Sequence, residues 1–91
     1  MFVVVSYDIV DDKRREKVAK ILKDYGVRVQ YSVFECELDR KYIIRMKKEI
    51  LAHIDKSTDS LRIYYLTEEC KKKIEIYGLG EYTHLDETIV I

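Results

Sequence analysis

Apolar residues open the chain in a run that has no helical period. Residues 2–8 read FVVVSYD and are rich in β-branched and aromatic side chains, which favour a strand. Because apolar residues occupy both odd and even positions, both faces of this strand are expected to be covered, which predicts a central place in a sheet. Asp8 ends the run, so the pattern predicts a carboxylate at the end of the first strand.

Two segments with a helical period follow. The first has apolar residues at i, i+3, i+4 and i+7, namely Val18, Ile21, Leu22 and Tyr25. We expect Asp11 or Asp12 to cap its N-terminus and Gly26 to end it in the C′ position. A second helix is expected after a cap at Asp39. Its apolar stripe comprises Ile43, Met46, Ile50, Leu51 and Ile54.

Between the two helices, residues 27–38 (VRVQYSVFECEL) alternate in the manner of a strand but change phase. Apolar side chains occupy odd positions as far as Val33 and even positions from Phe34 onward. A period of two cannot change faces without a bulge or a reversal of the chain. The segment is therefore either one bent strand or two short strands joined near residues 31–33.

The last third of the chain alternates short β-prone segments with polar ones. Residues 61–66 (LRIYYL) are predicted to form a strand, and residues 67–73 form a polar connection with room for one helical turn. A brief strand is expected at residues 74–77, closed by the glycines that follow it. Residues 88–91 (TIVI) at the end of the chain are again apolar and β-prone.

With two strands in the middle, the element order is βαββαβ, which is the ferredoxin-like plan of the α+β class. We expect residues 1–78 to form this domain, with two helices on one face of an antiparallel sheet, and residues 79–91 to form a C-terminal tail. Val3, Val5 and Tyr65 are expected to alternate outward on the other face. An uncovered apolar face favours a homodimer, and the β-prone end of the tail can pair with the edge of a partner's sheet.

Charge is distributed unevenly, although the formal net charge is zero. Residues 1–48 carry twelve Lys and Arg against eight Asp and Glu, a balance of +4, whereas residues 49–91 carry five against nine, a balance of −4. A positive first half fits a polyanionic ligand, and it also fits solvated helix faces. No apolar run approaches the ~20 residues of a membrane span, so no membrane contact is expected. Cys36 and Cys70 lack partners at metal-binding spacing, which indicates reduced thiols in a cytosolic protein.

Candidate chemistry is concentrated in residues 7–15 (YDIVDDKRR), because glycine-rich phosphate loops, zinc-protease motifs and nucleophile elbows are all absent. Asp8 is a hard oxygen ligand that suits Mg²⁺ or Mn²⁺, and a homodimer would supply a second Asp8 to a shared site. Such an ion can activate water and stabilise charge on a phosphodiester. The alternative is that Asp8 only satisfies backbone amides at the start of the helix.

Basic and polar side chains close to Asp8 in the sequence are candidates for holding phosphates. One set follows in the expected helix and comprises Arg14, Arg15 and Lys17. A second set shares one face of the next segment and comprises Arg28, Gln30 and Ser32. The second set fits the ordinary polar face of an edge strand as well, so both interpretations stay open.

Residues 7–36, YDIVDDKRREKVAKILKDYGVRVQYSVFEC, resemble the signature of the small CRISPR-associated nucleases of the Cas-two family. The distinctive features are YDI-x-DD-x-x-R, then YG, then VQYSVFEC at this spacing. The match is close over residues 1–38 and extends to layout and length beyond them. The resemblance implies a ferredoxin-like homodimer with an extra C-terminal strand exchanged or added across the interface, and a tight hairpin at residues 31–33.

The activity that the resemblance implies is metal-dependent endonuclease activity, on single-stranded RNA in some members and on double-stranded DNA in others. The family's metal-binding aspartate falls on Asp8, with Tyr7 beside it as a second catalytic candidate, and Mg²⁺ or Mn²⁺ is the expected cofactor. The family's nucleic-acid-binding positions fall on Arg15, Arg28 and Phe34. Lys17 stands where some relatives carry Arg, and a point charge there would weaken a bidentate phosphate contact.

Members of the family also join a separate integrase that inserts new spacers into CRISPR arrays, which gives a second hypothesis. In that role the chain is a non-catalytic homodimer that bridges duplex DNA. Acidic residues of the tail then meet a basic partner surface or are simply solvated, namely Glu81, Asp86 and Glu87. A third hypothesis is an RNA-cleaving toxin of similar fold. CRISPR adaptation with nuclease activity is the leading interpretation.

Overall fold

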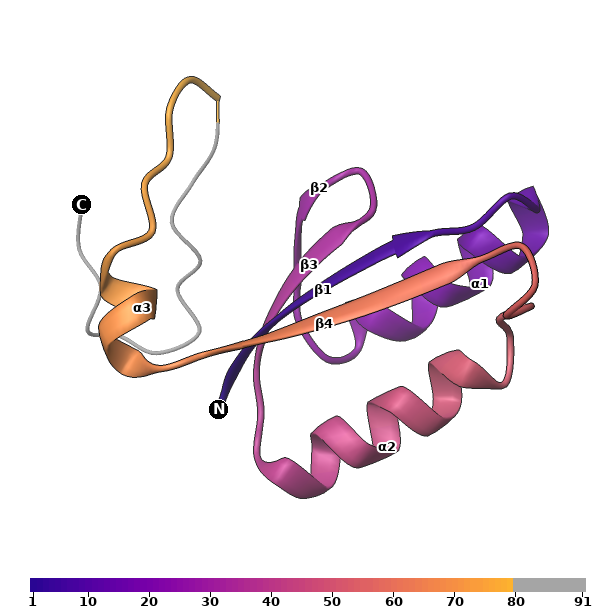
Figure 1. The fold of residues 1–91 in the computed structure, drawn as a ribbon, viewed down its shortest axis with the longest axis horizontal. Coiled ribbons are helices and arrows are strands. Elements are labelled where there is room, and N and C mark those ends of the chain that lie inside the picture. The colour runs from indigo at the N-terminus through magenta and orange to yellow at the C-terminus, as the bar shows by residue number, and fades with distance from the viewer. Residues whose placement is uncertain (80–91) are drawn as a thin grey trace.

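The computed structural model describes residues 1–79, and its element order is the expected βαββαβ followed by one short helix (Figure 1). The elements are β1 (Phe2–Asp8), α1 (Asp12–Lys23), β2 (Val27–Gln30), β3 (Val33–Glu37), α2 (Arg40–Leu51), β4 (Ser60–Leu66) and α3 (Glu68–Lys72). The α+β class and the ferredoxin-like order are therefore confirmed. None of the helices among residues 1–79 has the length and apolarity that crossing a bilayer requires.

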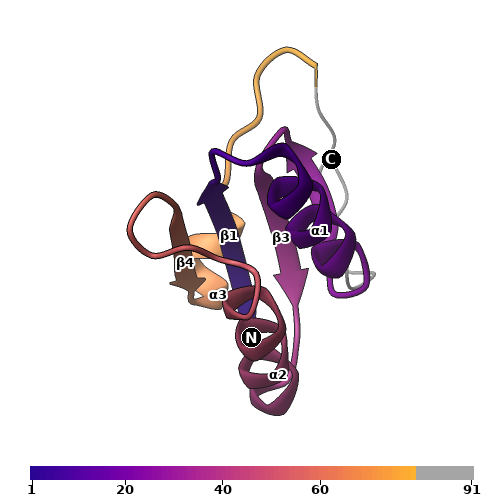
Figure 2. The ribbon, with the colours of Figure 1, turned by 90° about the vertical axis from the view of Figure 1, so that its right-hand side faces the viewer.

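The four strands form one sheet in the order β2-β3-β1-β4, and every neighbouring pair is antiparallel. The central place predicted for β1 is confirmed. Its side chains Val3, Val5 and Tyr7 join one core with buried residues of α1 and α2, so both long helices cover the same face of the sheet. Figure 2 shows the two helices along the strands that they cover.

The prediction about the faces of β1 is corrected by the structure. Val3 and Val5 were expected to point away from the helices, but both are fully buried beneath them. The other face, called the open face below, carries Val4, Ser6 and Asp8. Because β1 is apolar at both parities, its pattern alone could not distinguish the two faces. Tyr65 pairs with Val3 and lies on the helix side, although it remains exposed at the sheet edge.

The phase change in residues 27–38 is a reversal of the chain. β2 and β3 are separate antiparallel strands joined by Tyr31 and Ser32, so the two-strand alternative and the tight hairpin are confirmed. The register shifts between Arg28 and Gln30, which places one extra residue on the edge strand. All four residues of β2 are exposed, whereas β3 buries Phe34 and Cys36.

Gly26 has a different structural role from the predicted one, which was to end the first helix in the C′ position. Helix α1 ends at Lys23 with Asp24 as its C-cap, and the only glycine with positive φ among residues 1–79 is Gly78. A Cβ atom on Gly26 would lie 2.3 Å from the carbonyl oxygen of Glu35 and 2.4 Å from Sγ of Cys36. Gly26 is therefore required because the chain passes close to β3, and not because it ends the helix in a left-handed conformation.

The helix caps follow the predictions in part. Asp11 precedes α1 and its carboxylate accepts a hydrogen bond from the backbone nitrogen of Arg14 at 2.9 Å, so the cap at Asp11 is confirmed. Asp39 stands at the N-cap of α2, but its side chain makes no capping hydrogen bond. The predicted apolar stripes supply the buried helix residues Val18, Leu22, Ile43, Met46 and Ile50, whereas Leu51 is exposed.

The helical turn expected after β4 is present as α3, but residues 74–77 form no strand, which corrects that prediction. A strand is defined by its pairing, and these residues pair with no strand of the described sheet.

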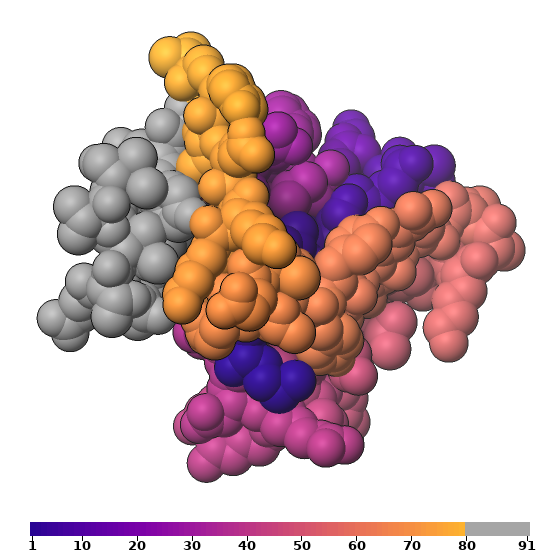
Figure 3. Space-filling model, turned by 60° about the vertical axis from the view of Figure 1, so that its left-hand side comes forward, coloured from indigo at the N-terminus to yellow at the C-terminus, as the bar shows by residue number. Residues whose placement is uncertain are grey.

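Lys71 of α3 is buried, with Nζ 3.0 Å from the carboxylate of Glu37 and 5.1 Å from the ring centroid of Phe2. Helix α3 therefore covers one end of the open face, and in Figure 3 its residues lie against the N-terminal residues. The predicted terminal strand and the acidic residues of the tail fall in residues 80–91, outside the described part.

Candidate metal and phosphate site

Asp8 is the last residue of β1, and its backbone pairs with Ser60 of β4. It is exposed on the open face, and within residues 1–79 its carboxylate takes part in no hydrogen bond or ion pair. The helix that follows is capped by Asp11, so the alternative role in which Asp8 serves the helix N-terminus finds no support. The Asp8 oxygens are thus accessible to a ligand from solvent.

A single copy of the described chain does not assemble a complete metal site. No group of three or more His, Cys, Asp or Glu side chains within residues 1–79 could hold an ion. Asp8 contributes carboxylate oxygens, which are the donors that Mg²⁺ and Mn²⁺ prefer. The donor chemistry of Asp8 fits such an ion, and further ligands must come from outside the described residues 1–79.

Tyr7 lies on the opposite face of β1 from Asp8 and is buried in the core. Its ring stacks on Phe34 with 6.4 Å between centroids, and its backbone nitrogen donates to the carbonyl oxygen of Ser32 at 3.1 Å. Its phenol oxygen accepts from Nη2 of Arg28 at 3.4 Å. Phe34 is fully buried. The side chains of Tyr7 and Phe34 therefore contact Arg28 from within the core, and neither ring is exposed to solvent.

Arg28 projects from β2 over these rings. Its Nε donates to the carbonyl oxygen of Tyr31 at 3.0 Å, and its guanidinium carbon lies 5.4 Å from the ring centroid of Phe34 and 5.8 Å from that of Tyr31. Aromatic faces attract a guanidinium, and the hydrogen bond fixes its direction. Arg28 is consequently held in place by contacts from the hairpin turn, from β3 and from β1 while remaining exposed.

The two arginines at the start of α1 have different surroundings. Arg14 makes a two-pronged ion pair with Asp59, with 2.9 Å between Nη2 and Oδ2, and the side chain of Asp59 is fully buried. Arg15 donates from Nη1 to the carbonyl oxygen of Ile9 at 2.9 Å and also pairs with Asp12. The hydrogen bond that Arg15 donates to the Asp12 carboxylate raises the pKa of Arg15 above its ordinary value. Arg15 therefore faces the end of β1, whereas Arg14 is engaged in a structural contact.

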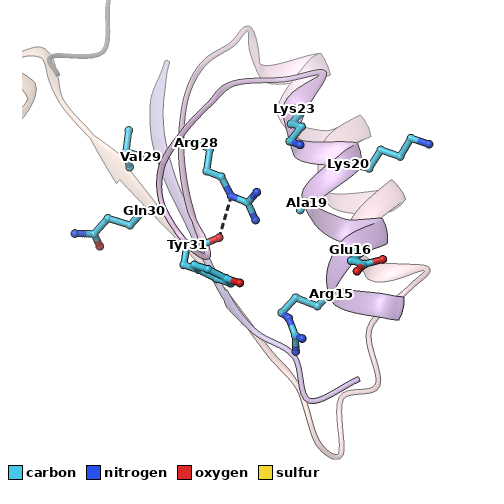
Figure 4. A pocket seen from close by; sticks show the side chains of 9 residues that line it. All are labelled: Arg15, Glu16, Ala19, Lys20, Lys23, Arg28, Val29, Gln30 and Tyr31. Carbon is cyan, nitrogen blue, oxygen red and sulfur yellow. Dashed lines mark hydrogen bonds between the residues drawn. The ribbon is translucent and has the colours of Figure 1, made fainter. Parts of the chain in front are cut away.

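A basic groove lies between α1 and the edge strand β2 (Figure 4). It is lined by Arg15, Glu16, Ala19, Lys20, Lys23, Arg28, Val29, Gln30 and Tyr31. We call it the α1–β2 groove. Four of these side chains are cationic and one is a carboxylate, so the groove has a net positive lining that suits phosphate groups. In Figure 4 the Arg28 side chain points from the hairpin toward α1.

The structure brings most of the predicted site residues to one place. Hydrogen bonds and ring contacts connect Tyr7, Arg15, Arg28, Ser32 and Phe34 with the end of β1, where Asp8 lies. Arg14 turns toward Asp59 instead, and Lys17 is exposed on α1 without lining the groove.

Sequence reasoning missed four residues of this neighbourhood. Asp59 was overlooked because it lies in a polar turn and no sequence pattern indicates its ion pair with Arg14. Lys20 and Lys23 resembled ordinary solvated helix residues, and Tyr31 was treated only as part of the hairpin. The sequence signal that could have indicated this groove is the i, i+3 spacing of Lys20 and Lys23, followed by an edge strand that carries Arg28.

The fold and the site together define a class, namely small ferredoxin-like α+β proteins with an acidic residue at the end of the first strand and a basic groove between the first helix and the edge strand. The family model described as CRISPR associated protein Cas2 matches residues 1–74. The chain is 50% identical over 80 residues to a CRISPR-associated endoribonuclease Cas2 of Chloroflexus aurantiacus, covering 88% of this chain and 86% of that protein. It is 41% identical over 87 residues to a CRISPR-associated endonuclease Cas2 of Thermus thermophilus, covering 96% and 92%.

Solved structures agree with the sequence comparisons. The crystal structure of Streptococcus pyogenes Cas2 at pH 6.5 superposes with a TM-score of 0.77 at 38% identity, covering 86% of this chain and all of that one. A chain of a partial Cas6-RT-Cas1–Cas2 complex superposes with a TM-score of 0.63 at 26% identity, covering 82% and 88%. The chain belongs to the Cas2 family of CRISPR-associated proteins.

Proposed function

We propose that this protein is a metal-dependent nuclease that acts on phosphodiester bonds as a homodimer in CRISPR adaptation. The observation that carries the proposal is the Asp8 carboxylate, which is exposed at the end of β1, while Arg15 donates a hydrogen bond to the carbonyl oxygen of the next residue, Ile9. Relatives named endoribonuclease and endonuclease support nuclease activity for the family. A single-stranded RNA or a double-stranded DNA is the proposed substrate.

A second copy of the chain would complete the site. The open face carries Val4 and the half-exposed Tyr64, which are cross-strand neighbours, together with Asp8 at one end of β1. A partner packed on this face by its own open face would bring its Asp8 toward the first. Two carboxylates with solvent and phosphate oxygens make a donor set of the kind that Mg²⁺ and Mn²⁺ bind.

The residues around the carboxylates would position the substrate. The ion would supply an activated water and stabilise negative charge on the phosphodiester. Arg15 and Arg28 would bind backbone phosphates, because guanidinium groups donate two hydrogen bonds to one phosphate. Tyr7 would act as a positioning residue, since its phenol oxygen accepts a hydrogen bond from Arg28.

The test is cleavage by wild type and Asp8→Ala, with labelled single-stranded RNA and double-stranded DNA, in Mg²⁺ or in EDTA. We expect cutting that needs the metal and falls by about 100-fold or more in Asp8→Ala, because the loss of a metal ligand removes several kcal/mol of charge stabilisation. Asp24→Ala is the matched control, since Asp24 is an exposed carboxylate at the C-cap of α1, away from Asp8. Equal cutting by wild type and Asp8→Ala would contradict the proposal.

The second candidate function is a non-catalytic DNA-bridging homodimer that binds an integrase. Its support is the likeness to a chain from the Cas1–Cas2-containing complex. This function requires phosphate contacts but no metal, so binding of duplex DNA should fall steeply with salt and persist in Asp8→Ala. Duplex binding without any Asp8-dependent cleavage would favour this candidate over the nuclease.

A further inference from the structure

Tyr31 is the most exposed aromatic side chain of the site, at 84% of its full accessibility. It stands in the turn between β2 and β3, and its ring lines the α1–β2 groove (Figure 4). An aromatic side chain presented to water beside cationic groups contributes nothing to the core, which already holds Tyr7 and Phe34. The arrangement is instead one that proteins use to stack the bases of a nucleic acid.

We propose that the α1–β2 groove binds a single-stranded segment of nucleic acid, with one base stacked on Tyr31 and the backbone held by Arg28, Lys20 and Lys23. This inference rests on the proposed function in one respect, namely that the ligand is a nucleic acid. It goes further by assigning a binding path and by preferring an unpaired strand to a duplex.

The charges of the groove are available to phosphates. Within residues 1–79 neither Lys20 nor Lys23 takes part in an ion pair, and both are exposed on α1. Arg28 uses Nε on the backbone of the hairpin turn, which leaves its guanidinium fixed but still exposed. Glu16 is the single carboxylate of the lining, so the cations outnumber it. A row of cations along a groove is suited to a phosphate backbone.

The preference for a single strand follows from the geometry of stacking. The guanidinium of Arg28 lies over the Tyr31 ring at 5.8 Å from its centroid, and the rest of the ring surface is open. Inside a duplex each base is already stacked on both faces, so a protein ring can stack only on an unpaired base. Tyr31 therefore adds affinity for a single strand and none for a continuous duplex.

One end of the groove adjoins the loop that follows β1, the strand whose last residue is Asp8. Ser32, the neighbour of Tyr31, accepts a hydrogen bond from the backbone of Tyr7, and Tyr7 precedes Asp8. Arg15 lines the same groove and donates to the carbonyl oxygen of Ile9, immediately after Asp8. A strand that passes from the groove across the hairpin turn thus reaches the end of β1.

The experiment measures binding by fluorescence anisotropy in EDTA, with a short labelled single-stranded RNA or DNA and a duplex of the same sequence. We expect Tyr31→Ala to weaken single-strand binding about ten-fold and to leave duplex binding within about two-fold. Tyr31→Phe should retain wild-type affinity, because the phenyl ring still stacks. Tyr77→Ala is the matched control, since Tyr77 is 83% exposed and does not line the groove.

The lysines are tested in the same assay. The double change Lys20→Ala with Lys23→Ala should weaken single-strand binding and reduce the slope of log K against log salt by about 1.4. The inference is overturned if wild type does not bind the single strand, if Tyr31→Ala changes nothing, or if Tyr31→Ala weakens single strand and duplex alike. Asp8-dependent cleavage with unchanged Tyr31→Ala binding defeats this inference alone. Tyr31-dependent binding without any cleavage defeats the nuclease alone.

Discussion

Asp59 joins two segments that lie far apart in the sequence. Its buried carboxylate accepts hydrogen bonds from the backbone nitrogens of Val10 at 3.2 Å and Asp55 at 3.0 Å, and from the guanidinium of Arg14. Burial alone would raise the pKa of Asp59, but these hydrogen bonds outweigh it and lower the pKa from 3.8 to about 2. The loop that follows Asp8 is therefore attached to the turn before β4 through one ionised side chain.

Replacing this carboxylate tests its contribution to stability. Because the pKa of Asp59 in the folded chain is below its unfolded value, its ionisation stabilises the fold above about pH 4, and the contribution is lost as the pH falls toward 2. We expect Asp59→Asn to lower the melting temperature by several degrees at neutral pH, with a smaller difference from wild type near about pH 3. Thermal unfolding followed by circular dichroism measures both values.

Asp24→Asn controls for the loss of one negative charge, because Asp24 is exposed at the end of α1. Its melting temperature should match that of wild type. An Asp59→Asn variant as stable as wild type at neutral pH would show that the ion pair with Arg14 contributes little to the fold.

At the scale of the elements, the β2–β3 hairpin carries the groove and one wall of the site. Its position depends on Gly26, where the chain leaves α1 and passes against β3. The backbone of Glu35 and the buried Cys36 leave no room there for a methyl group. Burial also raises the pKa of the Cys36 thiol to about 11, so this thiol stays protonated and packs as an apolar group.

A methyl group at this position should be costly. We expect Gly26→Ala to lower the free energy of unfolding by about 3 kcal/mol, because the new Cβ would overlap backbone atoms that cannot move without separating β2 from β3. Urea denaturation measures the change. Gly78→Ala is the comparison, since Gly78 has positive φ but open space around it, and its cost should be about 1–2 kcal/mol. A Gly26→Ala variant no less stable than Gly78→Ala would contradict the close approach to β3.

At the scale of the whole molecule, the two faces of the sheet are unequal. The helices α1 and α2 cover most of one face, whereas the open face is covered at one end by α3 and elsewhere presents Val4, Tyr64 and Asp8. Half-exposed apolar side chains in the middle of a sheet favour association with another surface. The proposed homodimer uses this face, and the same packing would assemble the pair of Asp8 carboxylates.

A charge placed on the open face should prevent that association. Tyr64 is 49% exposed, so Tyr64→Glu should leave the monomer folded while it shifts the sedimentation coefficient from dimer to monomer. Ile44→Glu is the matched control, because Ile44 is 54% exposed on α2 and belongs to no proposed interface. Sedimentation velocity of both variants tests the prediction. A wild-type monomer, or a dimer that survives Tyr64→Glu, would contradict the proposed packing.

Local sequence patterns were sufficient to predict the order and type of the main elements and the position of Asp8 at the end of β1. The period of 3.6 identified both long helices and the β-branched composition identified β1, whereas the change of phase near Tyr31 fitted either a bend or a reversal and the cap fitted Asp11 or Asp12. The resemblance carried by residues 7–36 indicated the family, because it rests on side chains that are close together in the sequence.

Contacts between residues far apart in the sequence could be found only in the folded chain. The tertiary structure placed Val3 and Val5 beneath the helices, because β1 is apolar on both faces and its pattern fits either side. It paired Arg14 with Asp59 across 45 positions and arranged Tyr31 beside the lysines of α1. Contacts of this kind arise from the packing of whole elements against one another, and no local spacing encodes them.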